Sequence, residues 1–171
     1  DRQKLALRLS DSRFVLAAEA THSNEKISVQ HLELSAGDTV LRASGELETG
    51  AQMAFAASGE LARFDPSRFA RLPAAALNGT LAASGRLQPR PVVEAQFQLR
   101  ESRLAGQPLS GRGDLVIDWP RIPRADIQLL AGPNRLTARG AFGQAGDSLA
   151  IDIAAPALAP YGAEGSLNAQ L

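Results

Sequence analysis

The stretch Leu77-Asn78-Gly79-Thr80-Leu81-Ala82-Ala83-Ser84-Gly85-Arg86-Leu87 sets the pattern of this 171-residue chain. Its odd-numbered residues are all apolar or small, and most of the residues between them are polar. Successive side chains of a β-strand point to opposite faces, whereas an amphipathic helix needs apolar residues three and four positions apart. The stretch therefore predicts a strand with one apolar face and one polar face.

The same alternation recurs along most of the chain. It occupies residues 5–9, 14–20, 27–29, 41–47, 53–61, 93–99, 109–119, 125–129, 136–142, 149–153 and 165–171. About a dozen short strands at this spacing, without long helical segments between them, predict an all-β protein and exclude a parallel α/β sheet. At His31-Leu32 the alternation shifts by one residue, which predicts a β-bulge.

One segment between the strands has the signals of a helix. Asp65 suits the N-cap position, Pro66 suits the first helical position, and Pro73 suits a helix end. Phe69 and Leu72 are three residues apart and would share one helical face. These signals predict one short helix over residues 66–72, and residues 156–161 form a second possible helical turn.

A loose internal repeat links the two halves of the chain. Phe64-Asp65-Pro66, a turn and then residues 77–83 correspond to Ala155-Pro156, a turn and then residues 165–169. We expect a single segment of a longer repetitive β array, with repeat units at about 1–87 and 88–171. The chain opens on Asp1 and stops in mid-pattern at Leu171, so we expect it to belong to a larger protein that carries any membrane anchor.

The composition argues against several classes of function. The 18 Lys and Arg residues balance the 18 Asp and Glu residues, whereas a nucleic-acid-binding protein would carry a basic excess. The absence of cysteine excludes a disulfide framework, a thiol nucleophile and a cysteine zinc site. No apolar run is long enough to cross a bilayer.

The candidate catalytic and ligand-binding motifs are weak. His22 and His31 have no partner at metal-ligand spacing, and Glu46 and Glu48 are better interpreted as part of a solvated strand face than as a hydrolase pair. Residues 112–114 read Arg-Gly-Asp, but they lie within a strand pattern and not in a loop. We therefore expect no enzymatic activity, no catalytic residue, no metal site and no cofactor.

Small residues stand beside the large apolar ones on the predicted apolar face. Either a second sheet packs closely against them in a sandwich, or they leave a channel for an apolar ligand. From the residues alone, the sandwich is favoured over the channel. The small residues are Ala43, Gly45, Ala57, Gly59, Gly79, Ala83, Gly85, Gly111, Gly113, Ala138 and Gly140.

Several segments resemble the repeats of the TamB family, which belongs to the AsmA-like, bridge-like lipid-transfer proteins of Gram-negative bacteria. The resemblance lies in residues 64–69 followed by 77–87, in residues 134–142, and in the Ala-Pro-Ala-Leu turn at residues 155–158. It implies an elongated curled β-sheet, a taco-like half-pipe with a hydrophobic concave groove. It also implies a location in the periplasm, within a parent protein anchored in the inner membrane.

The resemblance implies a function as well. The groove would conduct phospholipid acyl chains between the two membranes and would support outer-membrane protein assembly, including that of autotransporters. The parent protein would have the outer-membrane barrel protein TamA as its partner, and nucleic acid would not be a partner. The residues expected to line the lipid groove are Leu41, Leu47, Phe55, Leu61, Leu81, Ala83, Leu87, Phe97, Leu99, Leu115, Ile117, Leu136, Phe142 and Ile151.

Two other functions remain open on the sequence. A scaffold could hold unfolded outer-membrane strands by β-augmentation along an exposed sheet edge. A closed β-sandwich that binds carbohydrate or acts as an adhesin is weaker, because one Trp and one Tyr offer little surface for sugar stacking.

Overall fold

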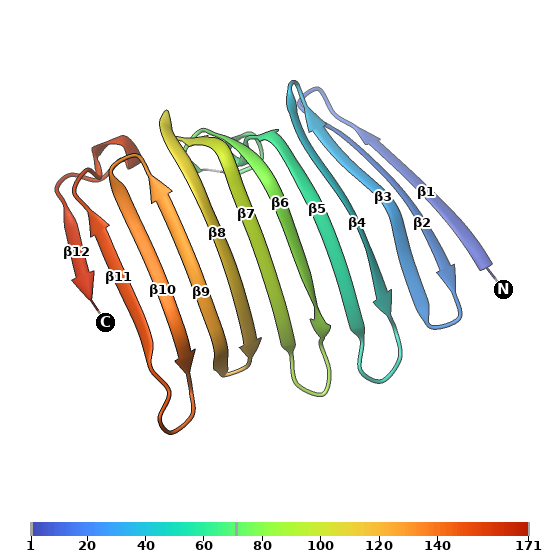
Figure 1. Cartoon of the computed structure of the whole chain (residues 1–171). Coiled ribbons are helices and arrows are strands. Elements are labelled where there is room, and N and C mark those ends of the chain that lie inside the picture. The colour runs from blue at the N-terminus through green and yellow to red at the C-terminus, as the bar shows by residue number, and fades with distance from the viewer. Residues whose placement is uncertain (1, 71, 171) are drawn as a thin grey trace.

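The computed structural model describes residues 2–70 and 72–170 and shows an all-β protein with twelve antiparallel strands in one sheet. The strands lie side by side in the order of the chain, from β1 at one end to β12 at the other (Figure 1). They are β1 Arg2–Ser10, β2 Val15–Ser23, β3 Lys26–Ala36, β4 Thr39–Glu48, β5 Ala54–Phe64, β6 Ala75–Arg86, β7 Val92–Leu104, β8 Gln107–Asp118, β9 Arg121–Ala131, β10 Asn134–Phe142, β11 Leu149–Ala155 and β12 Leu167–Gln170. No helix in the described part of the chain has the length and hydropathy needed to span a membrane.

The expectation of a two-sheet sandwich is wrong. All twelve strands belong to the same sheet, and within the described ranges no second sheet packs on either face. The small residues have another use, because they give room to large side chains of neighbouring strands. Phe97 on β7 lies opposite Gly113 on β8, and its ring occupies the space where a Cβ atom of residue 113 would be.

The predicted bulge at His31 is confirmed. The pairing of β3 with β4 shifts between Val29 and Leu32, and β2 shifts against β3 at Glu19–Ala20. Because the bulge shifts the alternation by one residue, Leu32 lies on the same face as Val29 although the two are three positions apart. The apolar face therefore continues across this irregularity.

The predicted helix over residues 66–72 is wrong in its length. The helical part is η1, a 3₁₀-helix of three residues at Pro66–Arg68, with Asp65 as its N-cap. The Asp65 carboxylate accepts hydrogen bonds from the backbone N–H of Ser67 and from the backbone N–H of Ala75, so it also fixes the start of β6. Arg71 lies outside the described residues. The second predicted turn contains η2, a 3₁₀-helix at Ala159–Tyr161.

The connections between strands lie along two opposite sides of the sheet, one at each end of the strands (Figure 1). We call one the covered edge; it contains the connections β1–β2, β3–β4, β5–β6, β7–β8, β9–β10 and β11–β12, and both 3₁₀-helices lie along it. We call the other the hairpin edge; it contains the five connections β2–β3, β4–β5, β6–β7, β8–β9 and β10–β11. The predicted units at about 1–87 and 88–171 each contain six strands, with a 3₁₀-helix between the fifth and the sixth.

Most of the buried side chains gather at the covered edge. Thr39 is 1% exposed, and its hydroxyl donates to the backbone carbonyl of Arg63. Phe69, which follows η1, packs against Phe64 and against Phe14 of the β1–β2 connection, with ring centroids 5.8 and 6.1 Å apart. The η1 segment thus reaches the hairpins that precede it. The other buried side chains at this edge are Ala36, Ser102, Leu109, Asn134 and Ala155.

Candidate apolar binding face

Strand pairing aligns apolar residues into rows that run across the whole sheet. The first row has one residue on each of the twelve strands: Leu9, Leu16, Leu34, Leu41, Leu61, Gly79, Leu99, Gly111, Leu129, Leu136, Ile153 and Ala169. The second row, on β1–β11, is Leu7, Ala18, Leu32, Ala43, Gly59, Leu81, Phe97, Gly113, Ile127, Ala138 and Ile151. The third, also on β1–β11, is Leu5, Ala20, Val29, Gly45, Ala57, Ala83, Ala95, Leu115, Ala125, Gly140 and Leu149.

No polar residue interrupts these three rows. A shorter fourth row on β3–β8 lies nearer the hairpin edge and consists of Ile27, Leu47, Phe55, Gly85, Val93 and Ile117. We call the surface formed by the four rows the apolar face. A sheet buried on one side normally places its apolar residues against a second layer, but none covers the centre of this face in the described residues.

Twelve of the fourteen predicted site residues lie in these rows. The first row contains Leu41, Leu61, Leu99 and Leu136; the second contains Leu81, Phe97 and Ile151; the third contains Ala83 and Leu115; the fourth contains Leu47, Phe55 and Ile117. The other two, Leu87 and Phe142, lie at the hairpin edge and are 40% and 58% exposed.

The list of predicted residues omitted several members of the rows. Leu9, Leu16 and Leu34 extend the first row over β1–β3, and Ile127 and Leu129 extend the second and first rows over β9. These residues have the same two-residue alternation as the predicted ones. The signal was therefore present in the sequence, and only the strand register shows that the residues share one surface.

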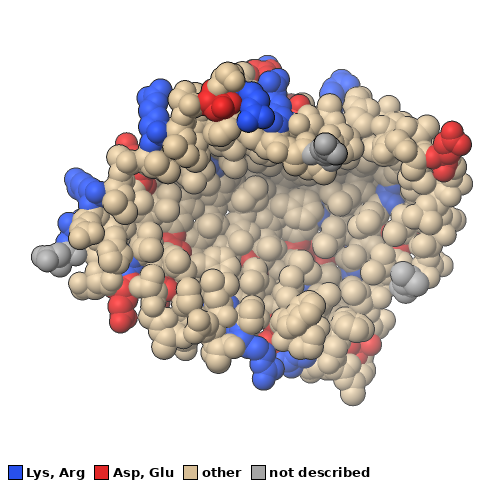
Figure 2. Space-filling model, turned by 180° about the vertical axis from the view of Figure 1, so that it is seen from behind, with Lys and Arg blue, Asp and Glu red and all other residues tan. Residues whose placement is uncertain are grey.

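The apolar face is hollowed, and its charged residues are at the margin. Figure 2 shows this side of the molecule with a broad tan depression and with most of the blue and red side chains around its rim. The rows that alternate with the apolar ones carry the strand charges on the opposite side, which we call the polar face. One such row runs Arg8, Ala17, Glu33, Arg42, Glu60, Thr80, Gln98, Arg112, Gln128, Thr137, Asp152 and Gln170.

Three shallow depressions of about 830, 1100 and 700 Å³ lie on the polar face and not on the apolar face. They are gaps between long side chains and are open to solvent. Ion pairs between neighbouring strands cross this face, including Arg42–Glu33 at 2.8 Å and Arg124–Asp114 at 2.7 Å. Because these charges are satisfied within the face and remain in water, the depressions are weaker candidates for a binding site than the apolar face.

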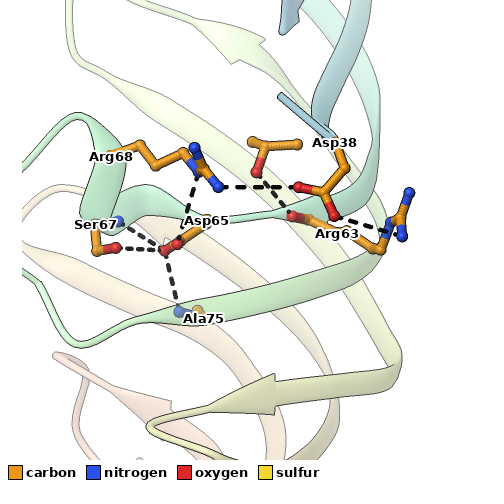
Figure 3. Close-up of polar contacts among 7 residues, drawn as sticks. Asp38, Arg63, Asp65, Ser67, Arg68 and Ala75 are labelled. Carbon is orange, nitrogen blue, oxygen red and sulfur yellow. Dashed lines mark hydrogen bonds and ion pairs between the residues drawn. The ribbon is translucent and has the colours of Figure 1, made fainter. Parts of the chain in front are cut away.

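A polar cluster fixes the covered edge beside the apolar face (Figure 3). Burial acts to raise the pKa of Asp65, but hydrogen bonds from Ser67 and Ala75 and the charge of Arg68 outweigh it and lower the pKa. Asp38 of the β3–β4 connection lies 3.4 Å from the guanidinium of Arg63 and 3.9 Å from that of Arg68. The cluster joins the β3–β4 connection, the end of β5 and η1. Its role is therefore to hold the η1 segment against the sheet.

Asn134 and Tyr161 hold the η2 segment against the sheet. The Asn134 side chain accepts from the backbone N–H of Ala157 at 3.1 Å and donates to the backbone carbonyl of the same residue at 2.8 Å. The Tyr161 hydroxyl donates to the carbonyl of Ala131 at 3.0 Å. These bonds attach the η2 segment to the β9–β10 hairpin.

The titratable residues do not form a metal site within residues 2–70 and 72–170, where no three His, Asp or Glu side chains converge. His22 lies on β2 opposite Ile27, and His31 lies in the bulge of β3. No protein-family model, curated protein or solved structure matches the chain. The likeness to the TamB family therefore stays a prediction, and the case for function depends on the apolar face.

Proposed function

We propose that the apolar face is a groove that binds phospholipid acyl chains. The observation that carries this proposal is the set of three uninterrupted apolar rows, two crossing eleven strands and one crossing all twelve. An acyl chain gains about 0.8 kcal/mol for each CH₂ group that it removes from water. A flexible hydrocarbon chain can use a broad apolar surface that presents no hydrogen-bond donor or acceptor.

The length of the rows favours movement along the sheet over a single binding position. Neighbouring strands are about 4.8 Å apart, so twelve strands extend the first row over about 50 Å. The tails of one leaflet span about 15 Å, half of a hydrocarbon core of about 30 Å. A tail can therefore occupy many equivalent positions and can pass between them without becoming fully hydrated, and this transfer needs no catalytic group.

The proposed context is a segment of a periplasm-spanning protein that conducts phospholipid between the inner and outer membranes and supports outer-membrane protein assembly. Its support is the resemblance to the TamB family, which would give the parent protein an inner-membrane anchor and TamA as a partner. The curled half-pipe of that family fits the hollowed apolar face (Figure 2), whose opposite side carries the polar residues of the strands.

Photo-crosslinking tests the proposed groove. A photoreactive residue is placed at Leu81 or Leu136 on the apolar face, and at Thr80 or Arg139 on the polar face as matched controls. The purified full chain is mixed with phospholipid, irradiated and examined by mass spectrometry. We expect lipid adducts at Leu81 and Leu136 only. Equal labelling of the two faces, or no adduct at either, would refute acyl-chain binding by the apolar face.

The exposed edge of β1 supports a second candidate function, a β-augmentation scaffold for outer-membrane strands. All nine residues of β1 are exposed, and one side of its backbone has no neighbouring strand in the described residues. Such an edge can pair with an extended polypeptide through its backbone groups.

The variant Ala83→Arg separates the two functions, because residue 83 lies in the middle of the third row. A guanidinium there brings water onto the apolar face, since an unpaired charge is costly to bury. Acyl-chain binding predicts loss of lipid adducts at Leu81. A scaffold that binds through the β1 edge predicts unchanged binding of an outer-membrane strand peptide and no lipid adduct in either protein.

A further inference from the structure

The two edges of the apolar face differ in how they end. At the covered edge, the η1 and η2 segments fold against the ends of the strands, and the exposed fractions of Ala36 and Thr39 fall to 2% and 1%. At the hairpin edge, three large apolar side chains are exposed: Leu87 by 40%, Trp119 by 67% and Phe142 by 58%. Exposed apolar side chains also occur on the η1 connection of the covered edge, where Phe69 is 41% and Leu72 is 53% exposed. The two edges differ because the η1 and η2 segments fold against the sheet at the covered edge, whereas the described residues of the hairpin edge include no such segment.

These three side chains form a line. Leu87 belongs to the β6–β7 connection, Trp119 to the β8–β9 connection, and Phe142 is the last residue of β10, at the β10–β11 connection. These are consecutive hairpins of the same edge (Figure 1), and because each is two strands from the next, they are about 10 Å apart. We call Leu87, Trp119 and Phe142 the apolar lip.

The first part of the lip is held in place by the neighbouring hairpin. The backbone N–H of Leu87 donates to the carbonyls of Gln52 and Met53 at 3.2 and 3.3 Å, and that of Gln88 donates to Gln52 at 3.1 Å. The β6–β7 connection is thereby fixed against the β4–β5 connection. These backbone hydrogen bonds hold Leu87 in position while its side chain is exposed to solvent.

The charges around the lip indicate what it contacts. Arg86 and Arg90 flank Leu87, and within the described ranges neither takes part in an ion pair. No acidic residue lies between positions 86 and 93. Arginine beside exposed Trp, Leu and Phe matches the boundary of a bilayer, where phosphate groups lie next to hydrocarbon and where Trp is enriched.

We propose that the hairpin edge docks on a lipid bilayer, with Leu87, Trp119 and Phe142 inserted at the boundary and Arg86 and Arg90 at the phosphates. Docking in this orientation lays the apolar rows along the bilayer surface, so that acyl chains enter the apolar face from its side, while the covered edge remains in water. The docking itself is independent of lipid transport; the route for acyl chains rests on the proposed function.

The single Trp of the chain makes the test direct, because all Trp fluorescence comes from the lip. The full chain is titrated with vesicles of equimolar phosphatidylcholine and phosphatidylglycerol. We expect a blue shift of the emission, quenching by brominated lipid tails, and weaker binding at high salt or to phosphatidylcholine alone. Leu87→Ser should weaken vesicle binding about tenfold, and the double variant with Phe142→Ser should abolish it.

The matched control is Leu72→Ser, because Leu72 is 53% exposed and belongs to the η1 connection at the covered edge. It should bind vesicles like the unmodified chain. An emission spectrum that vesicles leave unchanged, or an equal loss in Leu72→Ser and Leu87→Ser, would overturn the docking. A blue shift that grows with protein concentration without vesicles would show that the lip binds a second copy instead.

The outcomes also separate this proposal from the proposed function. Lipid adducts at Leu81 in a chain that does not bind vesicles would support the acyl-chain groove and refute docking by the hairpin edge. Vesicle binding without lipid adducts at Leu81 would support docking by the hairpin edge and refute the acyl-chain groove.

Discussion

At the scale of single residues, one asparagine joins three strands at two backbone irregularities. Arg63 on β5 and Glu101 on β7 both have a φ of +48°, and the pairing with β6 shifts beside each of them. The Asn78 side chain accepts from the N–H of Arg63 at 2.8 Å and donates to the carbonyl of Glu101 at 2.9 Å. It supplies backbone partners that the two bulges have lost.

We predict that Asn78→Ala lowers the free energy of unfolding by about 2 kcal/mol, because it leaves both backbone groups without their partner. Urea unfolding monitored by circular dichroism measures the change. Asn168→Ala is the matched control, since Asn168 lies on β12, is exposed and makes no side-chain hydrogen bond within the described ranges. Equal losses in the two variants would show that Asn78 has no such bridging role.

Asp65 makes the stability of the covered edge dependent on pH. Hydrogen bonds that outweigh burial lower its pKa below the ordinary value of 3.8 in the folded state. A group with a lowered folded pKa contributes stability above its unfolded pKa, and the contribution is lost as the pH falls through the folded value.

We therefore expect Asp65→Asn to be less stable than the unmodified chain at neutral pH, and the difference to shrink as the pH falls below the ordinary carboxyl value of 3.8 and through the lowered pKa of Asp65. Urea unfolding at several pH values follows this change. Asp147→Asn, at an exposed turn of the hairpin edge, reports the general effect of removing one carboxylate. A difference for Asp65→Asn that is constant over the acidic range would contradict the linkage.

At the scale of elements, β7 and β8 fit together through a large and a small residue. A Cβ atom at position 113 would collide with the ring of Phe97, so the apolar face is filled here by one side chain lying over its neighbour strand. We predict that Gly113→Ala destabilises the fold by about 1–3 kcal/mol, as overpacking does. Adding Phe97→Leu should recover most of this loss, and a double-mutant cycle in thermal unfolding measures the coupling. Additive effects would show that the two positions do not contact each other.

The elements that sequence predicts best are the strands, because their signal is local. Alternation such as Leu77, Gly79 and Leu81 needs no knowledge of the neighbours, and a slip such as the one at His31 is visible in the same pattern. The end of η1 is not visible in this way. The Asp65 carboxylate that caps η1 also accepts a hydrogen bond from the N–H of Ala75, ten residues away, and no local pattern indicates this contact. In the same way, the sequence around Asn78 does not indicate the two bulges that its side chain bridges.

At the scale of the whole molecule, the sequence predicts that one face is apolar but not what covers it. Gly45, Ala57 and Gly113 suit the contact of two sheets as well as they suit a single open sheet, and the choice between them depends on strand order. The candidate site was predictable to the extent that it repeats the alternation. The difference between its two edges was not, because it arises from where η1 and η2 fold back.

The strand order has a consequence for how such a chain is made and how it changes in length. Each strand pairs with the one synthesised just before it, so a nascent chain can add strands at the growing end without waiting for distant residues. No connection between the described strands crosses over another, and a two-strand hairpin could be gained or lost without rerouting the rest. The architecture can therefore be lengthened in steps of two strands, which extend the apolar face by about 10 Å each.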